Sequence, residues 1–112
     1  MTEAALGPSS AGSVVLDLGA DVGALVLHTP ASMDGREIEI SPDGADPARR
    51  THSQVRERRT AHRVQYAAVY PGLAAGPYTI WRDEHTTASV VTIRGGQVTS
   101  CHWPELSRRR LF

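Results

Sequence analysis

Arginine side chains are concentrated in one short segment of this 112-residue chain. Guanidinium groups bind carboxylates and phosphates through paired, charge-assisted hydrogen bonds. The segment from residue 49 to residue 63 therefore has the chemistry of an anion-binding surface, since it carries six arginines against the single acid Glu57: Arg49, Arg50, Arg56, Arg58, Arg59 and Arg63.

A period-two spacing gives this segment one polar face. If residues 51–58 form a strand, alternate side chains lie on the same side. A helix over residues 54–63 would have no apolar stripe to bury, which favours the strand. We predict that this face binds a protein partner and that four side chains form the binding site: His52, Gln54, Arg56 and Arg58.

Histidines are spread along the whole sequence, at positions 28, 52, 62, 85 and 102. Metal ligands of a sandwich come from distant segments, so this spacing leaves a metal site open. His52 is the first candidate because it lies among arginines, and His28 is the second because it follows an apolar run. A protein that binds a metal or a small anion through His52 and the neighbouring arginines is thus one alternative function. No cofactor is predicted.

The sequence contains no recognisable motif for nucleophilic catalysis. The chain has no Gly-x-Ser-x-Gly elbow and no cluster of calcium-type carboxylates. Cys101 is predicted to lie in a strand, without a helix N-terminus to lower its pKa, and to be a buried structural thiol. Its neighbour His102 should point to the opposite face of that strand. We therefore predict no catalytic residue and favour a protein that is not an enzyme.

Composition predicts a small soluble domain. Hydrophobic residues make up 40% of the chain and aromatic residues only 5%, so the core should be aliphatic. The single cysteine cannot form an intramolecular disulfide. The first residues lack the basic and apolar regions of a signal peptide, and no apolar run approaches the roughly 18 residues of a membrane span. A cytoplasmic protein without a membrane span is expected.

Charge is balanced overall but segregated along the chain. Residues 1–48 carry eight acids and one arginine, whereas residues 49–112 carry eleven arginines and four acids. In a sheet protein the two halves interleave, so we expect ion pairs between strands. The zero net charge, and the absence of interleaved aromatic residues from the arginine-rich segment, argue against a nucleic-acid partner.

Alternating aliphatic residues and Gly or Pro turn signals predict an all-β protein. The expected strands are 13–18, 24–29, 36–41, 51–58, 64–70, 77–81, 88–93 and 97–103, and the last two should form a hairpin over Arg94-Gly95-Gly96. Seven or eight such strands indicate a single Greek-key β-sandwich, transthyretin-like or Ig-like, over residues 13–104. Residues 1–12 are predicted to be a disordered segment, and residues 105–112 a basic tail. Exposed sheet edges leave a homodimer open.

Two resemblances accompany this prediction. Residues 70–80, Tyr-Pro-Gly-Leu-Ala-Ala-Gly-Pro-Tyr-Thr-Ile, resemble a corner of transthyretin-like (prealbumin-like) and carboxypeptidase-regulatory-like domains. The resemblance implies a corner over residues 71–76, with Leu73 closing one end of the sandwich. Residues 35–42, 50–52, 66–70 and 103–104, with the Gly-Gly turn, resemble small actinobacterial proteins that carry a phospholipase label, which implies a small hydrolase as a second alternative function.

Overall fold

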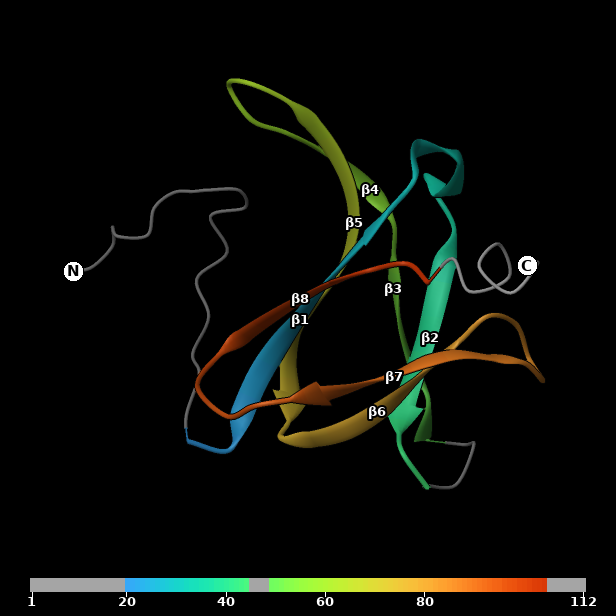
Figure 1. Ribbon diagram of the computed structural model, residues 1–112, viewed down its shortest axis with the longest axis vertical. Coiled ribbons are helices and arrows are strands. Elements are labelled where there is room, and N and C mark those ends of the chain that lie inside the picture. Colours follow the sequence, from blue (N-terminus) through green and yellow to red (C-terminus); the bar gives the residue numbers. More distant parts are fainter. Residues whose placement is uncertain (1–19, 45–48, 105–112) are drawn as a thin grey trace, which may run out of the picture.

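Two four-stranded sheets pack face to face in a β-sandwich, as the sequence predicts (Figure 1). The computed structural model describes residues 20–44 and 49–104. The first sheet has the order β4 (Arg56–Arg59), β5 (Val64–Ala74), β1 (Val22–Thr29) and β8 (Val98–His102), and the second has the order β3 (Thr51–Gln54), β2 (Glu37–Pro42), β6 (Gly76–Trp81) and β7 (Thr87–Ile93). The β1–β8 pair is parallel, and the other pairs are antiparallel.

Helical structure within the described residues amounts to the 3-10 turn η3 (Ala31–Met33) and a 3-10 conformation at Arg49. No helix in that part of the chain is long and apolar enough to cross a membrane. The strand predicted over residues 13–18, the disordered segment over 1–12 and the basic tail over 105–112 lie outside the described residues.

Alternation along the strands builds the core. Leu25 and Leu27 of β1 are fully buried, and so are Ile40 of β2 and its register partner Ile80 of β6. Ile38 is buried with them, as the alternation over residues 36–41 predicts. Burial of these aliphatic side chains, at about 25 cal/mol per Å² of apolar surface, is the main force that holds the sheets together.

The expected strand over residues 51–58 is wrong in one respect, because it divides at Val55. Val55 is fully buried and still exchanges backbone hydrogen bonds with the segment before β2, at 2.8 Å to Arg36 and 2.9 Å from Gly35. The chain then changes sheets, so that β3 is an edge of the second sheet and β4 an edge of the first. Strand β4 pairs with β5 only as far as Ala67. At Val69, the hydroxyl of Ser53 on β3 accepts a hydrogen bond from the backbone N–H at 3.2 Å and donates one to the C=O at 2.8 Å. Ser53 thus satisfies the backbone groups of Val69 on the open edge of β5.

The predicted corner over residues 71–76 is narrower than expected. Strand β5 continues to Ala74 and β6 starts at Gly76, whose φ of 137° favours glycine. Pro71 fits within β5 because the β1–β5 register shifts there, between the Gly23–Leu73 and Leu25–Tyr70 pairs. Leu73 is 8% exposed and belongs to the core cluster.

Strands β7 and β8 do not form the predicted hairpin. They follow one another, but β7 pairs with β6 in the second sheet and β8 pairs with β1 in the first. The turn between them uses its glycines in two ways. Gly96 has a φ of 75°, and a Cβ at Gly95 would overlap the backbone of Ala20. The Gly-Gly pair thus allows the chain to pass between sheets beside the start of β1.

Candidate functional site

Two of the predicted site residues lie on the outer face of the second sheet. His52 pairs with Glu39 and Gln54 pairs with Glu37, on the face opposite the buried Ile38. The His52 Nε2 atom is 3.6 Å from a carboxylate oxygen of Glu37. This part of the arginine-rich segment therefore faces acids.

The other two predicted residues lie on the outer face of the first sheet. Arg56 pairs with Ala67 and Arg58 pairs with Gln65 on β5. Ala68, which follows Ala67 in the chain, faces the core, so these two pairs lie on the other face of the sheet. Because the inner faces of both sheets meet in the core, their outer faces point in opposite directions. The structure thus separates the predicted set into His52 with Gln54 on one side and Arg56 with Arg58 on the other.

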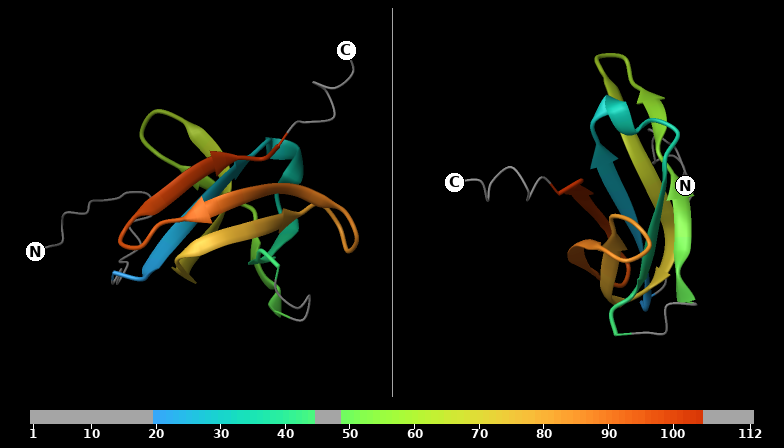
Figure 2. Two further views of the ribbon diagram at one scale, coloured as in Figure 1. Left: turned by 60° about the horizontal axis from the view of Figure 1, so that its bottom comes forward. Right: turned by 90° about the vertical axis from the view of Figure 1, so that its right-hand side faces the viewer.

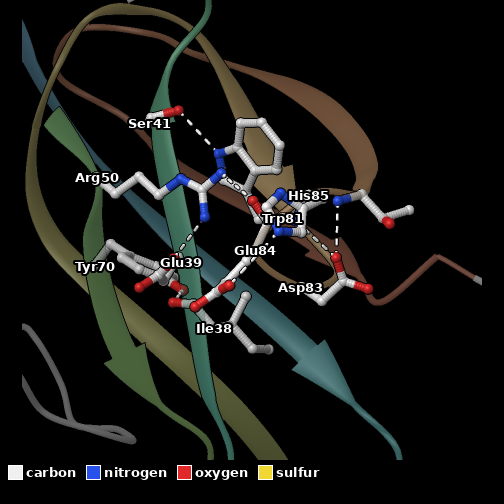
Figure 3. Close-up of polar contacts among 10 residues, drawn as sticks. Ile38, Glu39, Ser41, Arg50, Tyr70, Trp81, Asp83, Glu84 and His85 are labelled. Atoms are coloured by element: carbon white, nitrogen blue, oxygen red, sulfur yellow. Dashed lines mark hydrogen bonds and ion pairs between the residues drawn. The ribbon is translucent and has the colours of Figure 1, made fainter. Parts of the chain in front are cut away.

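Arg50 of the same segment is already bound within the protein (Figure 3). Its guanidinium lies 3.7 Å from the centroid of the Trp81 ring, and it donates hydrogen bonds to Glu39 Oε1 at 2.8 Å and to the Glu84 carbonyl at 3.0 Å. The pair of Arg50 and Glu39 is an ion pair between the acidic and basic parts of the sequence, as expected.

Arg56 and Arg58 instead continue into a row of basic side chains across the first sheet. Ala67 stands between Arg56 on β4 and His28 on β1, and His28 pairs with His102 on β8. We call the outer surface of this sheet the basic face and define it by seven residues: His28, Arg56, Arg58, Arg63, Gln65, Ser100 and His102. Arg63 lies in the β4–β5 connection, whose tip projects beyond the other strands (Figure 2).

Positive charge on the basic face is not neutralised by the described residues. Glu57 forms its ion pair with Arg59, and no described carboxylate forms one with Arg56, Arg58 or Arg63. Burial is the larger cause that lowers the pKa of Arg58, and the charge of nearby Arg56 lowers it further. The Arg58 Nε atom is buried and has no hydrogen-bond acceptor within the described residues. An anionic ligand on this face would supply the missing negative charge.

A histidine pair lies at the β1–β8 side of the basic face. The rings of His28 and His102 are stacked, with centroids 5.0 Å apart and an interplanar angle of 28°. Nε2 of His28 and Oγ of Ser100 form a 2.9 Å hydrogen bond, whose direction depends on the imidazole tautomer. Burial lowers the pKa of His28, and so do the nearby charges of His102 and Arg63.

Beside the histidine pair is an open pocket of about 340 Å³. Its polar lining includes His28, His102, Arg63 and Gln65, and no carboxylate of the described residues lines it. A comparable pocket of about 310 Å³ on the second sheet is lined by four acids, Glu37, Glu39, Asp83 and Glu84, against two arginines, Arg36 and Arg82. The two outer faces of the sandwich thus differ in electrostatic character.

The contact between Ser100 and His28 is the only nucleophile-and-base geometry that the described residues place on this face. Activation of a serine requires a histidine oriented by a third group, together with donors for the developing oxyanion. Among the described residues, His28 has the His102 ring as its neighbour and forms no hydrogen bond with a carboxylate. The described residues therefore supply a serine and a histidine in contact, without the third group of a triad.

A metal centre is less well supported than an anion site. No three His, Cys, Asp or Glu side chains of the described residues are grouped as metal ligands. His52 has Glu37 nearby, and the charge of Arg63 opposes a cation at His28 and His102. Cys101 lies beside Leu27 and packs against the core, but it is only partly buried, whereas the sequence predicted a buried thiol; this burial raises the pKa of the thiol.

Sequence reasoning missed the part of the site that β8 contributes. Ser100 and His102 have the period-two spacing of one strand face, and this signal was present. Their position next to His28 follows from the parallel pairing of β1 with β8, which no local pattern indicates.

Comparison with protein-family models, with curated proteins and with solved structures finds no match for this chain.

Proposed function

We propose that the protein is a non-catalytic binding module that recognises an acidic segment of a protein partner on the basic face. The observation that supports this most directly is the adjacent pair Arg56 and Arg58, two like charges without a carboxylate partner among the described residues. Neighbouring cations repel one another, and an acidic ligand removes that repulsion. The partner is expected to associate faster and more tightly at low salt.

We further propose that the sandwich is of the transthyretin-like type. The position of Leu73 in the core cluster, directly before the narrow turn from β5 to β6, supports this assignment. It bears on the architecture and leaves the ligand to be identified from the basic face.

The test compares two double variants with the same change in charge. Arg56→Gln with Arg58→Gln alters the basic face, whereas Arg36→Gln with Arg94→Gln alters exposed arginines elsewhere. Tagged proteins are purified from the native host, and the recovered partner is then titrated against each purified variant by calorimetry. We expect the wild type and the control variant to bind the partner, and the Arg56 and Arg58 variant to lose about tenfold or more in affinity. A partner held equally by both variants would contradict the proposal.

A small hydrolase is the second candidate, because of the 2.9 Å contact between His28 and Ser100. If Ser100 is a nucleophile, Ser100→Ala should abolish hydrolysis of p-nitrophenyl esters or phospholipid vesicles, whereas Ser89→Ala on β7 should retain it. Activity that is absent from the wild type, or unchanged in Ser100→Ala, would exclude this candidate.

A further inference from the structure

We propose that the pocket between β1, β8 and the β4–β5 connection binds a phosphoryl group, held by Arg63, His28 and His102. This inference rests on the proposed function, and it names the chemical group of the partner, a phosphorylated side chain, that the basic face receives.

The pocket gathers hydrogen-bond donors from three separate parts of the chain. His28 comes from β1, His102 from β8, and Arg63 and Gln65 from the β4–β5 region. A guanidinium offers several N–H donors in a planar fork, an amide offers two, and each imidazole offers one or two depending on its protonation. A phosphoryl group presents three acceptor oxygens, so these donors can be used together.

Charge at the pocket favours an anion, because Arg63 is cationic and no carboxylate of the described residues lines the pocket. The titratable and charged groups that face the histidine pair are His28 itself on β1, His102 on β8, and Arg63 and Tyr66 of the β4–β5 region. Arg56 and Arg58 lie farther along the same face of the sheet. None of these groups is an acid of the Asp or Glu type. A phosphoryl dianion would therefore meet cations and neutral donors, without a carboxylate to repel it.

A phosphoryl group fits the donors of this pocket better than a carboxylate, because it carries more negative charge and one more acceptor oxygen. In the free protein, burial and the charges of His102 and Arg63 disfavour the protonated form of His28. A bound dianion acts in the opposite sense and raises the pKa of a neighbouring imidazole. The second pKa of a phosphate monoester is about 6, close to the ordinary histidine value of about 6.5. A carboxylate carries a single charge and two oxygens, so it compensates Arg63 and two imidazoles less completely.

The size and shape of the pocket are consistent with this ligand. Its volume of about 340 Å³ exceeds that of a phosphoryl group, and its lining includes the exposed residues Ala31 and Val64. The remaining space can take the neighbouring atoms of a phosphorylated side chain. An extended acidic segment that leaves the pocket across Gln65 and Ala67 would reach Arg58 and Arg56, since the register places these pairs side by side.

The experiment is a titration of the full chain with O-phosphoserine, followed by NMR of the histidine side chains at pH 6 and pH 7.5. We expect saturable shifts of the His28 and His102 resonances, and a raised pKa of His28 in the bound state. Arg63→Gln should weaken binding by about tenfold or more, whereas Arg94→Gln, which makes the same change in charge on the β7–β8 turn, should not. His28→Gln keeps a hydrogen-bond donor but cannot be protonated, so it should reduce the dependence of affinity on pH.

Several outcomes would overturn the phosphoryl site. These are the absence of saturable shifts, equal affinity in Arg63→Gln and the wild type, or glutamate binding as tightly as phosphoserine. Binding to vesicles that contain phosphatidic acid, without binding to phosphoserine, would also overturn the assignment to a phosphorylated side chain. If the partner is lost in the Arg56 and Arg58 double variant while phosphoserine does not bind, only the pocket assignment fails. If phosphoserine binds as expected while that variant retains the partner, only the docking proposal fails.

Discussion

The hydroxyl group of Tyr70 donates a 2.7 Å hydrogen bond to the carbonyl oxygen of Ile38 (Figure 3). Tyr70 lies on β5 of the first sheet and Ile38 on β2 of the second, so this bond crosses the core and joins the two layers. Tyr70 is 3% exposed, and burial raises the pKa of its hydroxyl far above the ordinary value. Inside the core, the carbonyl of Ile38 has little access to water as an alternative donor.

Replacement of Tyr70 by Phe should lower the free energy of unfolding by about 1 to 2 kcal/mol, because it removes the only side-chain donor that the described residues direct at this carbonyl. The control is Tyr66→Phe, since the Tyr66 hydroxyl forms no hydrogen bond within the described residues. Urea unfolding measures the free energy of unfolding of both variants. Equal stability of the two variants would contradict a structural role for the bond.

The raised pKa of Tyr70 also predicts how stability changes in alkali. An unfolded chain loses this proton near pH 10, whereas the folded protein keeps it to a higher pH. The contribution of Tyr70 is therefore complete below about pH 10 and is lost as the pH rises from there towards the pKa of the folded state. Absorbance at alkaline pH should show a tyrosine that ionises only as the protein unfolds and that is missing from Tyr70→Phe. If all three tyrosines ionise together near pH 10, the burial of Tyr70 is wrong.

Replacement of Arg50 by Lys should destabilise the protein by about 1 to 2 kcal/mol, although the charge is unchanged. A lysine cannot stack flat on Trp81 and also donate to Glu39 and the Glu84 carbonyl. The ion pair contributes the smaller part of this effect, because the Glu39 side chain is 46% exposed. Tryptophan fluorescence during denaturation measures the change, with Arg36→Lys as the exposed control. A loss below about 0.3 kcal/mol would show that the stacking is not stabilising.

Two glycines offer a matched test of close packing between the start of β1 and the β7–β8 turn. A Cβ at Gly23 would overlap the Arg94 carbonyl and lie 2.8 Å from Cγ2 of Ile93, whereas a Cβ at Gly72 would meet nothing within 4 Å. We expect Gly23→Ala to cost about 1 to 3 kcal/mol and Gly72→Ala to change stability by less than about 0.5 kcal/mol. Thermal unfolding of both variants gives the comparison. A neutral Gly23→Ala would mean that the turn does not lie against β1 as described.

The lowered pKa of His28 predicts that stability falls in mild acid. An unfolded histidine binds its proton near pH 6.5, and the folded state binds it only at lower pH. The contribution of His28 is thus present above about pH 6.5 and is lost as the pH falls through the lowered pKa of the folded state. The stability difference between pH 7.5 and pH 5 should be smaller in His28→Gln than in the wild type. His85→Gln, an exposed histidine beside Glu84, is the control.

Local alternation was enough to predict most of the strands and their inward residues. The segment 36–41 places Ile38 and Ile40 on one side whatever strand it pairs with, because successive side chains of any strand point to opposite faces. The predicted bounds differ from β2 by a single residue at each end. Gly and Pro likewise mark turns through their own backbone restrictions. Fold class is therefore a property that this sequence carries locally.

The sheet to which each strand belongs was decided only in the tertiary structure. In the sequence, residues 51–58 have the period-two spacing of one continuous strand. The chain nevertheless changes sheets at Val55, so Arg56 and Arg58 are separated from His52 and Gln54. Strand β8 likewise leaves β7 and lies parallel to β1, which places His102 beside His28 across 74 residues of sequence. Pairing between distant strands depends on how the whole core packs. A period-two pattern shows which face of a strand is buried, but it does not show which strand lies next to it in the sheet. The basic face and its pocket are products of that pairing.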